Sequence, residues 1–209
     1  MEKKYVSVDI ESSGTTPGKY SMLSLGACVV GEAEKQFYRE LKPISKIFMP
    51  GAMAVACLGL KCLEAVKHKA EYDPKCVLFK PEMVLDLMEQ ECEEPGKAMN
   101  DFRSWVLEVT KGYRPVIAAR PTIYDGMFVA WYFDNFCDYE NPFGHSGEDI
   151  NSMYRGLMRD TKTNIDAIKL EPGVKHTHNA LEDAVEQALK FEHVLLMMKK
   201  SGEHLKPLL

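Results

Sequence analysis

The chain has 209 residues, of which 45% are hydrophobic and 27% charged, a composition typical of a globular protein that buries its core without disulfides or structural metals. Its net charge of −5 and isoelectric point of about 5.7 exclude a protein that coats duplex nucleic acid through a basic surface. The same acidity is compatible with an enzyme whose carboxylates bind divalent cations and whose contacts are confined to a few terminal nucleotides.

The cysteines and the N-terminal residues indicate the cellular compartment in which the protein is expected. The six cysteines form no CxxC pair and stand at positions 28, 57, 62, 76, 92 and 137. Residues 1–11 combine charged side chains with an apolar stretch too short for a signal peptide, and the chain has no apolar run of membrane-spanning length. We therefore expect a cytoplasmic protein with reduced thiols and a single domain over residues 1–209.

Residues 4–11 predict the first strand because apolar and polar side chains alternate there. One face carries Val6, Val8 and Ile10, and the other carries Tyr5, Ser7, Asp9 and Glu11. The sequence SSGTTPG then ends the strand, and further strands are predicted at residues 21–30 and 35–42. Three strands joined by short connections indicate an antiparallel meander.

The remainder of the chain mixes helical patterns with one more strand. Apolar positions at helical spacing predict helices, and a short apolar run predicts a buried strand. The helices are expected at residues 53–68, 81–92, from 97 onward, at 125–136 and at 179–200, and the strand at 115–119. Gly202 is the expected stop of the last helix. These elements predict an α/β fold, a mixed sheet with an antiparallel meander flanked by helices.

Asp9 and Glu11 are the first candidate site residues. Because they stand two positions apart on a strand, they project from the same face and can grip a divalent cation such as Mg²⁺, which prefers oxygen ligands. A lone D-x-E is more often a solvated strand edge. Here the apolar neighbours indicate a packed strand, where clustered acids are costly unless they are neutralised.

Two later motifs add further acids. His178 and Asp183 form an H-x(4)-D pattern at the start of the last helix, and Asp125 opens the aromatic helix at 125–136. Each motif alone is explained by helix capping, since Asn179 is a good cap and acids in a first turn favour the helix dipole. Their significance comes from their combination with the D-x-E strand.

The three motifs together resemble the DEDDh group of 3′–5′ exonucleases, which have an RNase H-like fold. The resemblance rests on VSVDIESSG, YDGMF and HNALEDA, in chain order, and it covers most of the chain. It implies hydrolysis of phosphodiester bonds from the 3′ end of single-stranded DNA or RNA, with release of nucleoside 5′-monophosphates.

The resemblance also implies roles for individual residues. Two Mg²⁺ or Mn²⁺ ions would be held by Asp9, Glu11, Asp125 and Asp183. His178 would be the general base that deprotonates the attacking water.

Substrate binding is expected from three further residues. Ser12 and Ser13 match positions whose backbone meets the terminal sugar in the resembling family. Where relatives often carry His-Asn before the second-motif Asp, this chain has Arg120 and Pro121, and Arg120 could meet a phosphate or be structural. Residues 50–95 are longer than the compact family pattern and are expected to form a variable helical insertion.

Other patterns leave alternatives open. His176 and His178 could ligate zinc, but no further Cys or His at useful spacing completes a set, and His176 is expected to stand apart from the chemistry. Lys61, Lys67 and Lys69 could guide a strand to the site or form a solvated helix face. The alternative function is a module of the same fold that holds nucleic-acid ends or a partner without cutting. Both a monomer and a homo-oligomer are compatible with the sequence.

Overall fold

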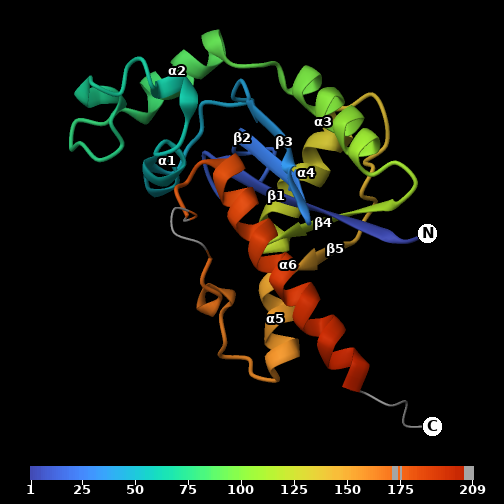
Figure 1. The fold of residues 1–209 in the computed structure, drawn as a ribbon. Helices are drawn as coiled ribbons and strands as arrows, with labels where there is room; N and C mark the ends of the chain where they lie inside the picture. The colour runs from blue at the N-terminus through green and yellow to red at the C-terminus, as the bar shows by residue number, and fades with distance from the viewer. Residues whose placement is uncertain (171–173, 175, 205–209) are drawn as a thin grey trace.

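A five-stranded mixed sheet forms the centre of the computed structural model, which describes residues 1–170, 174 and 176–204 (Figure 1). The strands are β1 (Lys3–Ser12), β2 (Met22–Val29), β3 (Glu32–Glu40), β4 (Arg114–Ala119) and β5 (Gly147–Asp149), in the order β3–β2–β1–β4–β5. β1, β2 and β3 pair antiparallel as a meander, and β4 and β5 continue the sheet in parallel with β1. The expected α/β sheet with an antiparallel meander is confirmed.

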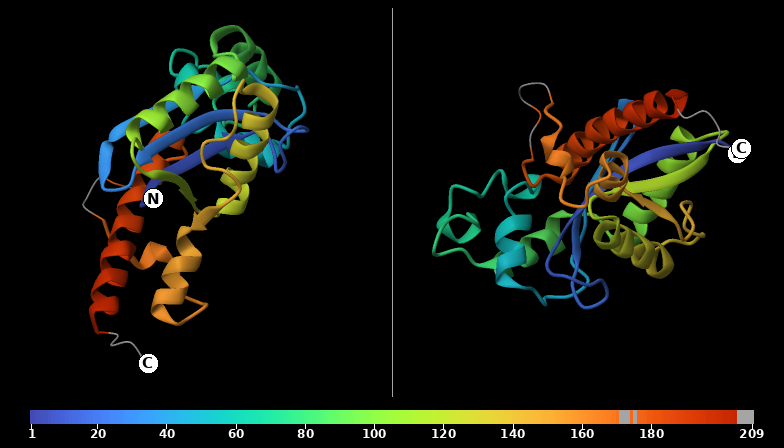
Figure 2. Two further views of the ribbon diagram at one scale, coloured as in Figure 1. Left: turned by 90° about the vertical axis from the view of Figure 1, so that its right-hand side faces the viewer. Right: turned by 90° about the horizontal axis from the view of Figure 1, so that it is seen from below.

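Helices cover both faces of this sheet (Figure 2). α3 and α4 pack on one face, whereas the long α6 crosses the other face with α5 beside it. The helices are α1 (Pro50–Ala56), α2 (Pro81–Glu91), α3 (Pro95–Val109), α4 (Thr122–Phe136), α5 (Ile150–Met158) and α6 (Ala180–His204). Three short 3₁₀ helices are η1 (Lys61–Leu63), η2 (Ala70–Tyr72) and η3 (Ile165–Ala167).

The alternation along β1 decides what each face of the sheet carries. The apolar residues of β1 are buried in a hydrophobic cluster with side chains of α3 and α4. On the opposite face, Tyr5 packs against Phe191 of α6 with ring centroids 5.1 Å apart. Asp9 and Glu11 share this second face, so the acids of β1 point toward α6.

The structure corrects two predicted helices. The helix expected at 53–68 ends at Ala56, and the chain continues through η1 and η2. Here the backbone packs closely on the loop before α6. A Cβ built on Gly59 would lie only 2.2 Å from the His178 carbonyl oxygen. Gly202 does not stop α6, which runs on to His204. A glycine inside a helix costs only about 1 kcal/mol, which neighbouring turns can outweigh.

Residues 41–93 complete the core at one end of the sheet. Met53, Leu63, Leu85 and Met88 are buried together with Leu23 of β2. This segment contains α1, α2 and two 3₁₀ turns, so less of it is helical than the sequence analysis expected. All six cysteines of the chain are free. Within the described residues, no helix combines the length and the apolar character needed to cross a bilayer.

Two elements between α4 and α6 were not predicted. β5 has only three residues, too few for an alternating pattern to be recognised. α5 begins at Asp149, whose side chain accepts a hydrogen bond from the Ser152 amide and caps the helix.

The first turn of α6 touches the backbone of β2 at Gly26. A Cβ built on this residue would lie 2.2 Å from both the carbonyl carbon of Ala180 and the amide nitrogen of Leu181. Gly26 is the partner of Asp9 in the pairing of β1 with β2. The close approach that glycine permits therefore brings the start of α6 beside the acids of β1.

We expect Gly26→Ala to push α6 away from the sheet, because the new methyl group would meet backbone that has no room to rotate aside. Overpacking of this kind costs about 1–3 kcal/mol, which thermal unfolding would register as a lower Tm. Gly156→Ala in α5 is the control, since a Cβ there meets nothing within 4 Å. Equal Tm values for Gly26→Ala and the wild type would contradict the contact.

Candidate active site

Asp9, Glu11 and Asp183 meet where α6 begins. One carboxylate oxygen from each residue lies within 4.8 Å of the others. Asp9 and Glu11 are each 9% exposed, and Asp183 is fully buried. The pairing of β1 with β2 shifts register between Glu11 and Ser12, so the regular ladder ends beside the acids. Residues from both ends of the chain thus form one buried acidic cluster.

Asp125 joins this cluster from α4. Its Oδ1 accepts a hydrogen bond of 3.0 Å from the amide of Ile10, the residue between Asp9 and Glu11. α4 starts at Thr122, so Asp125 lies within the first turn rather than at the opening of the helix. The structure therefore brings together all four carboxylates that the sequence motifs indicate.

The loop before α6 holds Asp183 in place. Its Oδ1 accepts a hydrogen bond from the Thr177 amide at 2.7 Å, and its Oδ2 accepts one from the His178 amide at 2.9 Å. Asn179 caps the helix as expected, by accepting hydrogen bonds from two amides of the first turn. The side chain of Asn179 also donates to the Gly59 carbonyl at 2.8 Å, which ties the loop to the segment after α1.

Two imidazoles border the acidic cluster. His178 Nδ1 lies 4.0 Å from Glu11 Oε1, and its side chain is 32% exposed. His176 Nδ1 lies 3.0 Å from Asp183 Oδ2, so the expectation that His176 stands apart from the site is wrong. The loop turns at His178, whose φ of 62° is left-handed, and this turn leaves the two ring centroids 4.3 Å apart.

Burial and mutual repulsion disfavour the charged forms of these acids. Burial, helped by the charges of Asp183 and Asp125, raises the pKa of Glu11 to about 8. Burial also raises the pKa of Asp125 to about 7, and that of Asp9 well above its ordinary range. The pKa of His178 is lowered, first by burial and then by the neighbouring His176.

The cluster suits a divalent cation. Its donors are carboxylate oxygens, which hard cations prefer, and they converge from three separate elements. Among the described residues, the ion pairs of these acids involve only the two histidines and no Lys or Arg. A bound cation would supply the positive charge that the surroundings lack, so the residues fit a metal site.

Two contacts that orient the site were not predicted. Gln187 lies one turn after Asp183 on α6 and donates from Nε2 to Asp9 Oδ1 at 2.7 Å. The Tyr124 hydroxyl shares a hydrogen bond of 2.6 Å with Ser12 Oγ. The contact of Gln187 could have been predicted from its i,i+4 spacing to Asp183, because that spacing places both side chains on one side of a helix.

The residues expected to bind substrate have partners within the protein. The Ser13 amide donates to the Ser21 carbonyl at 2.9 Å, and the Ser13 carbonyl accepts from the Met49 amide at 2.8 Å. Arg120 forms an ion pair with Asp166. The buried side chain of Ser12 is likewise engaged. Substrate contacts of Ser12, Ser13 and Arg120 stay predictions.

Comparison with solved structures relates the fold to exonucleases. The nuclease domain of 3′hExo, a DEDDh family member solved with rAMP, matches with a TM-score of 0.61 at 10% identity, over 97% of this chain and 94% of that one. Escherichia coli exonuclease I, solved with a dT13 oligonucleotide, also gives 0.61 at 12% identity, over 97% of this chain but only 43% of its own length. At such identities the likeness shows the fold, which is RNase H-like.

Sequence comparison decides the family. No family model matches the chain. The 3′–5′ DNA exonuclease Cap18 of Escherichia coli is 36% identical over 201 residues, which span 94% of each chain. The chain belongs to the same family of 3′–5′ exonucleases as this relative. It is therefore an enzyme, and the alternative of a non-cutting module is not supported.

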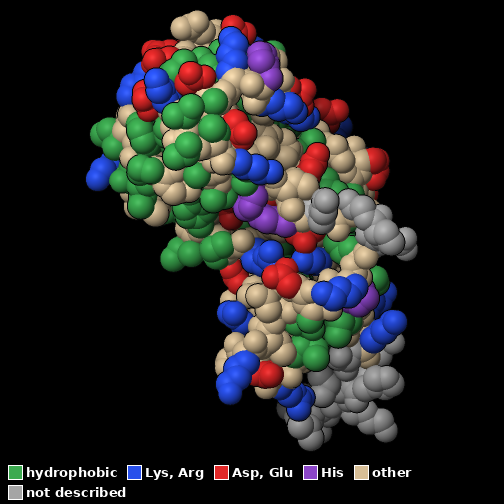
Figure 3. Space-filling view, turned by 90° about the vertical axis from the view of Figure 1, so that its left-hand side faces the viewer, with side chains coloured by type: hydrophobic (Ala, Val, Ile, Leu, Met, Phe, Trp, Pro, Cys, Tyr) green, Lys and Arg blue, Asp and Glu red, His purple; other side chains and the backbone are tan. Residues whose placement is uncertain are grey.

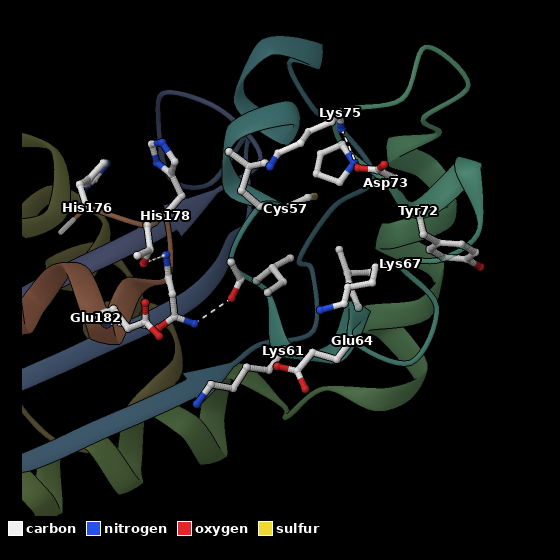
Figure 4. A pocket seen from close by; sticks show the side chains of 17 residues that line it. Cys57, Lys61, Glu64, Lys67, Tyr72, Asp73, Lys75, His176, His178 and Glu182 are labelled. Atoms are coloured by element: carbon white, nitrogen blue, oxygen red, sulfur yellow. Dashed lines mark hydrogen bonds between the residues drawn. The ribbon is translucent and has the colours of Figure 1, made fainter. Parts of the chain in front are cut away.

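The exonuclease is hollowed beside its two imidazoles, on the face that Figure 3 shows. This hollow of about 730 Å³ lies between residues 57–75 and the loop that leads into α6 (Figure 4). Lys61, Lys67 and Lys75 line it, whereas Lys69 does not. His176 and His178 line the hollow and also border the acidic cluster, so the hollow opens beside the cluster.

We expect Glu11→Gln to stabilise the metal-free exonuclease at alkaline pH. The folded state raises the pKa of Glu11 from 4.5 to about 8, so it binds a proton that the unfolded chain has released. Stability therefore falls as pH rises from about 5 to 8, and the amide should remove on the order of 1–3 kcal/mol of that loss.

Thermal unfolding in chelator, measured at pH 5 and pH 8, checks this expectation. The gap between variant and wild type should open only at the higher pH. Glu34→Gln, on an exposed side chain of β3, is the matched control. If Glu11→Gln were no more stable than the wild type at pH 8, the folded state would not raise the pKa of Glu11.

Proposed function

We propose that the chain is a metal-dependent exonuclease that removes nucleotides from the 3′ end of single-stranded DNA and releases nucleoside 5′-monophosphates. The cluster of four carboxylates beside His178 is the observation that carries this proposal. DNA is proposed as the substrate because the relative with 36% identity is a DNA exonuclease. A single strand is proposed because exonuclease I, which shares the fold, was solved with single-stranded DNA.

Two Mg²⁺ or Mn²⁺ ions would be held by Asp9, Glu11, Asp125 and Asp183. When bound, the ions supply Lewis acidity toward the phosphate and offset the charge that develops on the leaving 3′ oxygen. One oxygen of Asp9 lies within 4.8 Å of an oxygen of Glu11 and of Asp183, and Gln187 donates a hydrogen bond to Asp9 Oδ1 at 2.7 Å. This hydrogen bond would hold the Asp9 carboxylate in a fixed orientation for the ions.

His178 is the proposed general base. Because burial and His176 lower its pKa, the imidazole is neutral near neutral pH and has a ring nitrogen able to take a proton from the attacking water. Its side chain is 32% exposed, so water can reach it. His176, which contacts Asp183 and packs edge-on against His178, orients both residues.

The DNA strand would approach through the hollow beside His178. Lys61, Lys67 and Lys75 offer positive charge to its phosphates, and none of them forms an ion pair with a carboxylate of the described residues. Figure 4 shows the side chains of Lys67 and Lys75 directed toward the His178 side of the hollow. Glu64, Asp73 and Glu182 also line the hollow, so the three lysines would act as local contacts for a few phosphates within a wall of mixed charge.

Digestion of 5′-labelled oligonucleotides tests the proposed function. In Mg²⁺ or Mn²⁺, a linear DNA strand should shorten from its 3′ end, and a chelator should abolish the reaction. Asp9→Asn should lower kcat by at least about 10²-fold, because it removes a carboxylate from the cluster. An RNA strand of the same sequence, run in parallel, reports the preference for DNA.

A circular single strand is the control for this assay, because it has no 3′ end. We expect it to survive while the linear strand is consumed. Rapid cutting of the circle, or full activity in chelator, would contradict the proposal. Asp134→Asn is the matched variant, since Asp134 lies on the exposed side of α4 and outside the cluster.

Glycine variants of the two histidines test the general base. His178→Gly removes the imidazole while suiting the left-handed backbone at this position, and it should lower kcat by roughly 10²–10⁴-fold. Added imidazole should restore part of that rate. His176→Gly should weaken metal binding and gain nothing from imidazole. Rescue of His176→Gly instead of His178→Gly would reverse the assignment.

A further inference from the structure

A second group of metal-ligating side chains lies outside the active site. Glu40, Cys62 and Cys92 each place one ligand atom within 4.8 Å of the other two. Glu40 is the last residue of β3, Cys62 lies in η1, and Cys92 directly follows α2. Three elements that are separate in the sequence therefore converge on one point at the edge of the sheet.

The carboxylate of Glu40 is held firmly but keeps room for a ligand. Its Oε2 accepts a hydrogen bond from the Cys62 amide at 2.9 Å, and its Oε1 accepts from the Lys61 amide and the Tyr38 hydroxyl. A carboxylate offers about four lone-pair directions, so one on Oε2 is still free. The hydrogen bonds fix this oxygen beside the two thiols.

The two thiols face each other next to this negative charge. The Cys92 thiol, burial and the Glu40 carboxylate together raise the pKa of Cys62 far above its ordinary value. In the metal-free group the Cys62 thiol therefore keeps its proton. A divalent cation of thiolate-binding character would replace the thiol protons and satisfy both sulfurs and the carboxylate.

Space for a further ligand lies over the group. A hollow of about 620 Å³ is lined by Glu40, Cys62 and Cys92, and its other charged lining residues are Lys61, Glu91 and Glu93. Glu91 adds negative charge to this hollow, whereas Glu93 is already paired with Arg39 and Lys97. The hollow is open enough to admit water as a fourth ligand, which completes the tetrahedral set that zinc prefers.

We propose that Glu40, Cys62 and Cys92 form a binding site for zinc or a similar thiolate-binding divalent cation, separate from the active site. The bound ion would fasten η1 and the end of α2 to the edge strand β3. η1 contributes Lys61 and Leu63 to the wall of the hollow beside His178, so the ion would also steady that wall.

Titration of the reduced, full-length protein with Cd²⁺ tests this site. Cadmium–thiolate bonds absorb in the ultraviolet at wavelengths shorter than the Tyr and Trp bands, so we expect a difference absorbance that saturates at one equivalent per chain. The signal should be lost in Cys62→Ser and in Cys92→Ser and reduced in Glu40→Gln. It should persist in Asp9→Asn, which alters the carboxylate site alone.

Two controls make the outcome unambiguous. Cys76→Ser and Cys137→Ser alter partly exposed free cysteines outside the group and should keep the full signal. Thermal unfolding in chelator checks that the Cys62 and Cys92 variants still fold, and Zn²⁺ should raise the Tm of the wild type but not theirs. Absence of thiolate absorbance from the reduced wild type would overturn the proposal. So would a Cys62–Cys92 disulfide whose reduction leaves a protein unable to bind Cd²⁺.

Discussion

The start of α6 lies against the bare backbone of β2, and the acidic site depends on that contact. Because Gly26 has no side chain, the first turn of α6 comes close enough for Asp183 and Gln187 to reach Asp9. Bringing these acids together costs electrostatic free energy, since burial and mutual repulsion raise the pKa of Asp9 and of Glu11. Apolar packing of α6, through Phe191 and its neighbours, must outweigh this repulsion, so stability and function oppose each other here.

The sequence predicted the strands and helix ends that depend on the spacing of neighbouring residues. The alternation of β1 gave its two faces and the shared direction of Asp9 and Glu11, and the capping pattern at Asn179 located the start of the last helix. Contacts between segments that are far apart in the chain produce no repeating pattern in the sequence. α1 ends early in a stretch whose backbone packs on the loop before α6, and His176 reaches Asp183 because that loop turns at His178. Both depend on tertiary packing that a periodicity cannot encode.

The acidic cluster and the group at β3 differ in their donor atoms. Carboxylates from β1, α4 and α6 form the proposed active site, whereas the group at the edge strand combines two thiols with the Glu40 carboxylate. Burial together with the charge of Glu11 raises the pKa of the Cys57 thiol to about 12. It therefore stays a neutral, buried thiol. Soft cations gain little at the catalytic acids, which favours selective loading by hard ones.

The order of the site residues along the chain has a consequence for synthesis. Asp9 and Glu11 belong to the first strand, but Asp183 and Gln187 come from the last helix. A growing polypeptide can pair its strands and place Asp125 long before these two residues leave the ribosome. Until then the cluster lacks one carboxylate and the restraint on Asp9. The four carboxylates of the proposed site therefore come together only when α6 docks on the sheet.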